Sequence, residues 1–344
     1  MHMADALISP AVGGTMWAAT AALIGYSAKK VKKDGDERKV PLMGVLGAFI
    51  FAAQMINFTI PATGSSGHLG GGMILAILLG PWAAFLVMAS VLTVQALFFA
   101  DGGLLALGCN IFNLGFFPCF IAYPLIYKKM TGDEPSQGKI LAASIIAAAV
   151  SLQLGAFGVV LETVFSGISE LPFKTFVLLM QPIHLAIGIV EGLVTAAVVT
   201  FVWKARPEIL TAAWQGKAVG NINTKKVIIG LLIAAAIVGG GLSWFASSNP
   251  DGLEWAMFKT SGKEELGSEN TVHTSLASVQ EKTAFLPDYG FKKAEPEAEN
   301  AEGREPSWPA IDPGTSVSGF VGAVLTLLMA VLIGWALKKR NIAS

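Results

Sequence analysis

Nine apolar runs constrain this chain more than any other feature of its sequence. Several of them approach or exceed the roughly 20 residues that an α-helix needs to cross a bilayer. Helices are the only open-ended structures that satisfy their backbone groups in lipid. The sequence therefore predicts an all-α, polytopic membrane protein with about nine transmembrane helices, at residues 7–27, 41–60, 69–84, 85–100, 103–127, 139–162, 178–203, 227–247 and 317–337.

The composition agrees with a membrane protein and gives no support to a nucleic-acid-binding protein. Hydrophobic residues make up 53% of the chain and charged residues only 14%, with a formal net charge of zero. Nothing in this balance indicates a nucleic-acid partner. Cys109 and Cys119 lie in one apolar run, where buried inert thiols are expected rather than a disulfide or a metal pair.

Charge bias decides the number of crossings. Most basic residues cluster in four polar segments, which the positive-inside rule places in the cytoplasm: 29–39, 128–139, 204–226 and 338–340. Residues 69–100 form either one long helix or a tight hairpin broken at Gly80-Pro81. Only the hairpin puts every basic cluster on one side. We therefore predict nine crossings, two of them short, with the N-terminus outside and the C-terminus in the cytoplasm.

A polar linker at 206–226 divides the chain into a seven-helix unit, 1–205, and a two-helix unit, 227–344. Between the last two helices, the segment 248–316 holds 13 acidic against 6 basic residues and is rich in Ser, Pro and Gly. We expect a solvated, partly disordered external loop that attracts cations weakly. His273, within this segment, is expected to be solvated.

The chain opens with Met1-His2, a chemically unusual start. The terminal amine, the His2 amide nitrogen and the His2 Nδ1 atom form fused five- and six-membered chelate rings on one metal ion. Tetragonal nitrogen sites suit Ni(II) or Cu(II). His68 lies in a glycine-flanked loop, 57–72, on the same predicted outer face. From the residues alone, His68 is either the fourth nitrogen or a surface histidine without a ligand.

The combination of three features resembles the nickel/cobalt branch of the energy-coupling factor (ECF) transporters. The features are the Met1-His2 start, the stretch from Asn57 to Gly72, and the pentapeptide Pro250-Asp251-Gly252-Leu253-Glu254. The first seven predicted helices resemble the NikM/CbiM substrate-binding component. The last two resemble its small partner NikN, here fused. The resemblance covers nearly the whole chain except most of 265–316.

The resemblance implies a subunit that takes up Ni(II) or Co(II) as transported substrate, with no permanently bound cofactor. It implies that the Met1 amine, the His2 amide and imidazole nitrogens and His68 hold the metal at a free, unextended terminus. It also implies a transmembrane coupling (T) subunit and ATPase subunits as partners, in the plasma membrane of a prokaryote. The sequence has no Gly-rich loop ending in Gly-Lys-Ser/Thr, so ATP hydrolysis is expected on those partners and the chain is not expected to be an enzyme.

Asp5, Asn57 and Ser66 lie close in sequence to the predicted ligands and are candidates for orienting them. The alternative for each of the three is a structural role as a helix cap or turn residue. Ala48 and Ala52 have the small-xxx-small spacing that allows close helix approach. Substrate-binding components of the resembled class use such a surface to dock on the T subunit; packing within the chain is the alternative.

His184 and Glu191 lie seven residues apart, on nearly one face of a predicted transmembrane helix. Ionisable residues there indicate either a transient metal station or a buried hydrogen-bonded pair that fixes helix packing. The preference between nickel and cobalt stays open, including a cobalt-specific component that feeds cobalamin synthesis. Two other functions also stay open: a membrane metal receptor without transport, and a carrier for an organic solute.

Overall fold

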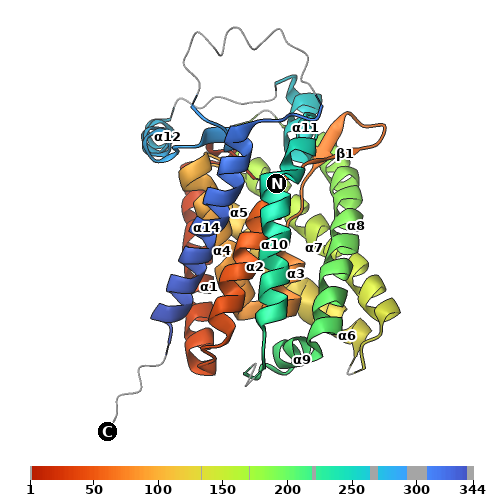
Figure 1. The fold of residues 1–344 in the computed structure, drawn as a ribbon. Helices are drawn as coiled ribbons and strands as arrows, with labels where there is room; N and C mark the ends of the chain where they lie inside the picture. Colours follow the sequence, from red (N-terminus) through yellow and green to blue (C-terminus); the bar gives the residue numbers. More distant parts are fainter. Residues whose placement is uncertain are drawn as a thin grey trace.

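A computed structural model describes residues 2–132, 134–169, 171–218, 222–263, 270–292 and 308–338. Long helices run side by side between two ends of the molecule (Figure 1). A two-stranded ribbon lies at one end, the ribbon end, together with α11, Gly252–Ser261, and α12, Thr271–Thr283. The other end, the α9 end, holds α6, Lys128–Thr131, and α9, Pro207–Gln215. The all-α prediction is confirmed, since the described strands are only the short β1 and β2.

Each of the nine apolar runs coincides with a helix or a nearly continuous helical segment. Five of these are long and apolar enough to span a bilayer: α4, the segment 107–131, α7, α8 and α14. The segment 107–131 begins as α5, Leu107–Ile111, is wound as a π-helix at Phe112–Tyr127, and ends as α6, Lys128–Thr131. The nine segments are α1 Pro10–Asp34, α2 Lys39–Gln54, α3 Gly72–Leu79, α4 Pro81–Phe99, 107–131, α7 Gln137–Ser166, α8 Phe173–Ala205, α10 Lys225–Gly240 and α14 Pro313–Ala336.

The predicted hairpin within 69–100 is present and breaks at Gly80-Pro81 as predicted, so the boundary between its helices lies there rather than at 84–85. Gly80 has a φ of +77°, a conformation that favours glycine, and Pro81 occupies the first turn of α4. Only eight residues remain for α3, about 12 Å of helix. The preceding residues reach it through the ribbon of β1, Phe58–Ile60, and β2, Ser65–Gly67.

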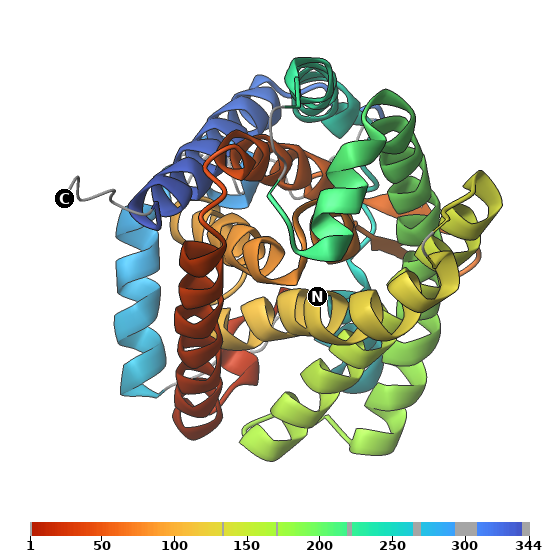
Figure 2. The same ribbon diagram turned by 90° about the horizontal axis from the view of Figure 1, so that it is seen from below.

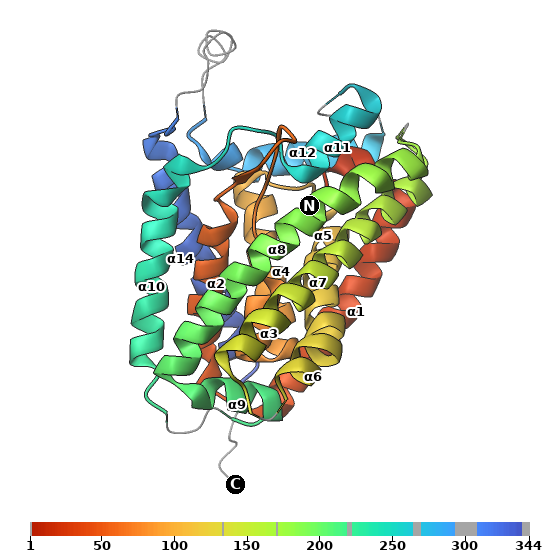
Figure 3. The same ribbon diagram turned by 90° about the vertical axis from the view of Figure 1, so that its right-hand side faces the viewer.

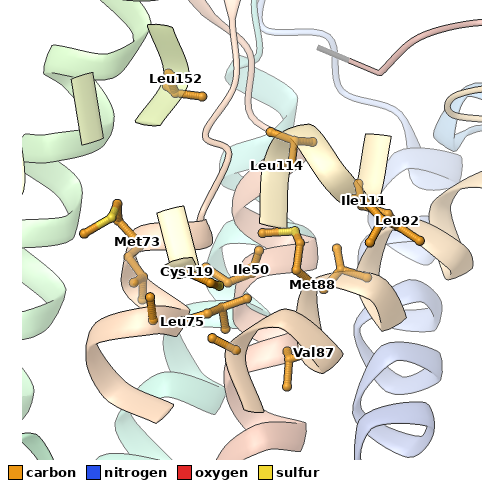
Figure 4. Packing of buried hydrophobic residues seen from close by; sticks show 14 of the residues in the cluster. Ile50, Met73, Leu75, Val87, Met88, Leu92, Ile111, Leu114, Cys119 and Leu152 are labelled. Carbon is orange, nitrogen blue, oxygen red and sulfur yellow. The ribbon is translucent and has the colours of Figure 1, made fainter. Parts of the chain in front are cut away.

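The core lies where α2, α3, α4 and the segment 107–131 meet. Figure 4 shows Cys119 with Ile50, Met73 and Met88 in this apolar cluster. Cys109 and Cys119 are both buried and free, as expected. Apolar side chains from α2, α3, α4 and the segment 107–131 therefore form the core of the protein.

The two-helix unit packs directly on the seven-helix unit. Helix α2 contacts both α10 and α14. A Cβ atom placed on Gly319 of α14 falls 2.3 Å from the Gly239 carbonyl oxygen of α10, so these backbones meet closely. On α2, Ala48 and Ala52 are almost fully buried, and Ala52 faces Gly239. These small residues therefore admit helices of the same chain, which corrects the prediction that Ala48 and Ala52 form a surface for docking on a T subunit.

The segment 248–316 also differs from the expectation of a solvated loop. Its described part forms α11, Gly252–Ser261, α12, Thr271–Thr283, and a short 3₁₀ turn η4, Pro287–Tyr289. These elements lie across the ribbon end (Figures 1 and 3). The prediction of a solvated His273 is wrong: it is only 5% exposed, and its Nε2 lies 2.8 Å from the Ile8 carbonyl oxygen. Buried apolar side chains such as Leu253 and Leu286 hold the segment down despite its acidity.

Candidate metal centre

Two histidines that are 66 positions apart meet at the ribbon end. The ring centroids of His2 and His68 are 4.9 Å apart and the rings are tilted by 39°. Both side chains are largely buried, with 7% and 11% of their surface exposed. Met1 lies outside the described residues. The structure therefore brings together the two histidines singled out from the sequence.

The N-terminal segment is inserted into the body of the protein. Met3 is fully buried. Its backbone N–H donates to Asn110 Oδ1 at 2.8 Å, and its carbonyl accepts from Asn110 Nδ2 at 3.2 Å. The Gly103 N–H donates to the same carbonyl at 2.9 Å. Asp5 Oδ1 accepts from the Ala106 N–H at 2.9 Å. These four hydrogen bonds fix the backbone on both sides of the 102–106 turn, and so fix the start of the chain.

The loop that carries His68 is held from two sides. Glu191 of α8 accepts from the Gly70 N–H at 2.7 Å and from the Gly71 N–H at 3.1 Å, one on each carboxylate oxygen. Gln54 Nε2 donates to the Gly70 carbonyl at 2.8 Å. Glu191 thus serves as an anchor for the residues that follow His68.

The hydrogen bond of His68 leaves one ring nitrogen suited to a metal. Its Nδ1 lies 3.1 Å from the Leu69 carbonyl oxygen. A carbonyl only accepts, so Nδ1 carries the proton and Nε2 carries the lone pair. Burial, followed by nearby positive charges, lowers the pKa of His68 to about 3. The imidazole is therefore neutral near pH 7, the state in which histidine binds metals.

His2 is held differently. Its Nδ1 lies 2.6 Å from Asp101 Oδ1, and its buried Nε2 has no hydrogen-bond partner among the described residues. The Tyr289 hydroxyl donates to the other oxygen of Asp101. Although burial opposes it, the charge and hydrogen bond of His2 and the Tyr289 bond lower the pKa of Asp101 to about 2. A chelate through Nδ1 requires His2 to exchange Asp101 for the metal.

The conspicuous pentapeptide supplies a second carboxylate. Asp251 caps α11: one oxygen accepts from the Leu253 and Glu254 N–H groups at 2.7 and 2.9 Å. Its other oxygen lies 3.9 Å from His68 Nε2. Burial raises the pKa of Asp251, but the nearby positive charges and hydrogen bonds outweigh it and leave the pKa well below its usual range.

Of the three residues proposed to orient the ligands, Asp5 and Ser66 tie segments together. Asp5 bonds to the turn before α5, as described above. Ser66 joins β2 to the pentapeptide: its N–H donates to the Pro250 carbonyl and its Oγ to the Asn249 carbonyl, both at 2.8 Å. Asn57 lines the same cavity as His2 and His68, a space of about 540 Å³, and its carbonyl accepts from the Ser247 N–H.

His184 and Glu191 bond to different partners rather than to each other. His184 is 1% exposed, and its Nδ1 lies 2.8 Å from the Met180 carbonyl oxygen. Its ring lies beside Gly252, where a Cβ atom would come within 3.2 Å of His184 Cε1. A small cavity between His68, His184 and Asp251 has about 10 Å³ open to a water centre, roughly the space of one water molecule. His184 therefore stands directly behind the His68 loop.

Comparison with known proteins places this geometry in a family. The CbiM family model, described as the cobalt uptake substrate-specific transmembrane region, matches residues 2–209, more than half of the chain. The chain belongs to the CbiM family. The model of the PDGLE domain matches residues 225–339. We refer to these two ranges as the CbiM unit and the PDGLE unit.

Individual relatives agree with this assignment. A putative fused nickel transport protein NikMN from Archaeoglobus fulgidus is 31% identical over 341 residues, covering 98% of each chain. A putative metal transport protein from Haloquadratum walsbyi is 38% identical and covers 62% of this chain and 95% of its own length. A crystal structure of a truncated transition metal transporter is 33% identical, with a TM-score of 0.53, and covers 60% of this chain and 99% of that one. The chain is therefore a membrane transport component of the CbiM and NikMN type.

Two carboxylates at this CbiM centre escaped sequence reasoning. Asp101 is the one charged residue between two apolar runs and precedes Gly102-Gly103. This pattern predicts a loop, but it does not predict that Asp101 contacts His2. Asp251 stood out only as part of the pentapeptide. Among the described residues, no three His, Cys, Asp or Glu side chains are close enough to share a metal ion. A metal held here by four protein groups therefore requires some that are not side chains.

Proposed function

We propose that this protein is the substrate-binding membrane subunit of an ATP-driven ECF-type transporter that imports Ni(II) or Co(II). The observation that carries the proposal is the meeting of His2 and His68, 4.9 Å apart, at the end of an N-terminal segment bonded into the protein body. The match to a cobalt uptake family and the similarity to a nickel transport protein NikMN support nickel and cobalt as the substrates.

The proposed ligands are the Met1 amine, the His2 amide nitrogen and Nδ1, and His68 Nε2. The lone pair on His68 Nε2 and the neutral state of that ring support its role. The amide nitrogen must lose its proton, which favours metals able to displace it. A square-planar nitrogen field suits low-spin nickel, and the fused arrangement also favours nickel over cobalt. The order of intrinsic affinity favours copper, so its exclusion rests on availability and on rigidity of the site.

Orientation and partners complete the proposal. One cavity at the α9 end is lined by residues of α9 and of the basic segments near 29–39, 128–139 and 338. Basic segments favour the cytoplasmic side of a membrane. Their position supports a cytoplasmic α9 end and an external ribbon end. The absence of a nucleotide-binding motif from the sequence supports separate ATPase subunits, joined through a T subunit. The boundaries 1–205, 206–226 and 227–344 remain our division of the chain into functional parts.

A one-residue extension tests the ligand set. Adding Ala before Met1 moves the amine away and turns His2 into the third residue, with every side chain kept. We expect nickel binding, measured by calorimetry on the purified full chain, to weaken at least 100-fold. An Ala added after Ser344 is the matched control and should bind as the parent does. Equal affinity of the two extended chains would refute the terminal chelate.

A second experiment tests transport. Uptake of labelled nickel into proteoliposomes should require the T subunit, the ATPase subunits and internal ATP. His68→Ala should lose both binding and uptake while its thermal unfolding stays cooperative. Uptake by the chain alone at the full rate, or normal binding by His68→Ala, would contradict the proposal.

A further inference from the structure

A second cavity lies far from the metal centre. A cavity of about 450 Å³ opens at the α9 end, between the end of α1, the start of α2, the α3–α4 turn, α9, Pro207–Gln215, and the end of α14. Figure 2 looks onto this end of the bundle, and Figure 3 shows α9 crossing it. The proposed uptake function makes no use of this space.

The cavity is lined by more cations than anions. Its five lysines are Lys30, Lys33, Lys39, Lys128 and Lys338, against the three carboxylates of Asp34, Asp36 and Glu37. Glu37 is already paired with Lys338, at 2.6 Å. The net charge of the lining is therefore positive, and one of its carboxylates is neutralised by a lysine at the rim.

Two donors in the lining have no acceptor. Lys39 is 8% exposed, and within the described part of the chain it forms no ion pair or side-chain hydrogen bond. The indole N–H of Trp214 is buried without a partner among the described residues. An ammonium group without an ion pair, on a side chain with so little exposure, favours an anion beside it. Lys39 and Trp214 both line the cavity, so an acceptor-rich anion there lies within reach of Lys39.

The backbone adds to the positive field. Residues Gly80 to Ala83, the first turn of α4, line the cavity, and no side chain caps this helix. The N-terminal turn of this 19-residue helix therefore borders the cavity. Uncapped helix N-termini favour phosphate and other anions.

Aromatic side chains indicate which kind of anion fits. Trp82, Trp214 and Tyr123 line the cavity, and Lys30 Nζ lies 5.7 Å from the Trp82 ring centre. Tryptophan and tyrosine with lysine at helix ends are typical of the level of lipid headgroups. Basic pockets between transmembrane helices bind anionic headgroups. We propose that this cavity binds the phosphate of an anionic phospholipid, with Lys39 as its central contact.

Native mass spectrometry of the purified full chain in neutral detergent tests the proposal. We expect phosphatidylglycerol to bind and to raise the thermal unfolding temperature, and phosphatidylcholine to do neither. Lys39→Gln should weaken phosphatidylglycerol binding about fivefold, the effect of removing one lysine near a headgroup. Lys128→Gln is a second variant with the same expectation. Lys174→Gln, exposed at the opposite end of the molecule, is the matched control.

Nickel binding checks that each variant is folded, because the lysines are remote from His2 and His68. Failure of this proposal therefore leaves the proposed uptake function untouched. Equal binding of the two lipids, or unchanged phosphatidylglycerol binding by Lys39→Gln and Lys128→Gln, would overturn the proposal. Displacement of the lipid by equimolar glycerol 3-phosphate would assign the cavity to a soluble phosphate and overturn the lipid assignment.

Discussion

Replacing Glu191 with glutamine tests how far the His68 loop depends on a single carboxylate. Glu191 is 1% exposed and accepts from the Gly70 and Gly71 N–H groups, one on each oxygen. Glutamine keeps one acceptor but turns an NH₂ group toward the other N–H. One buried donor then loses its acceptor, at a cost of about 1–3 kcal/mol. The loop can relax when it is empty, so the metal has to restore its order.

If about 2 kcal/mol of this cost falls on the metal-bound state, the Kd for nickel rises roughly 30-fold. Calorimetry on Glu191→Gln measures that rise. Glu162→Gln is the matched control, because this buried carboxylate accepts from Asn113 Nδ2 at 2.7 Å and does not contact the loop. We expect the control to bind nickel as the parent does. Tight nickel binding by Glu191→Gln would refute the anchoring role and leave His68 positioned by the ribbon and by Gln54.

Three further predictions concern stability of the metal-free chain. Burial lowers the pKa of His68 to about 3, so below pH 6.5 the unfolded chain takes up a proton at His68 that the folded chain does not. His68 should therefore contribute about 2 kcal/mol to the stability lost by pH 5, and unfolding titrations of His68→Gln should show a loss smaller by that amount. Ala52→Leu, at a fully buried contact with α10, should destabilise the chain by about 1–3 kcal/mol, whereas an unchanged unfolding temperature would reopen that face as a docking surface. Gly319→Ala should separate α10 from α14 and lower the unfolding temperature, because its Cβ meets the Gly239 backbone; normal stability would contradict this close contact.

Local patterns in the sequence predict the helices well because each apolar run must satisfy its own backbone in lipid. The break at Gly80-Pro81 is readable for the same reason, since the two residues favour a turn wherever they lie. Small-residue spacing is weaker information. It predicts that α2 approaches another helix closely, but not that the helices are α10 and α14 of the same chain.

Long-range contacts of the site are not readable from any local pattern. Asp101 reaches His2 across 99 positions, and Asp251 reaches His68 across nearly twice that number. The acidity of 248–316 predicted solvation, yet the burial of His273 depends on its contact with the Ile8 carbonyl. Such pairings follow from how helices stack, which the order of residues along one segment does not specify.

The contacts of the PDGLE unit indicate why it accompanies the CbiM unit in one chain. Ser66 bonds to the carbonyls of Asn249 and Pro250, next to the Asp251 that faces His68. The Tyr289 hydroxyl bonds to Asp101, the partner of His2. Each histidine is thus held or faced by a carboxylate that the PDGLE unit either supplies or positions. Any displacement of that unit relative to the CbiM unit would therefore change the surroundings of both histidines together.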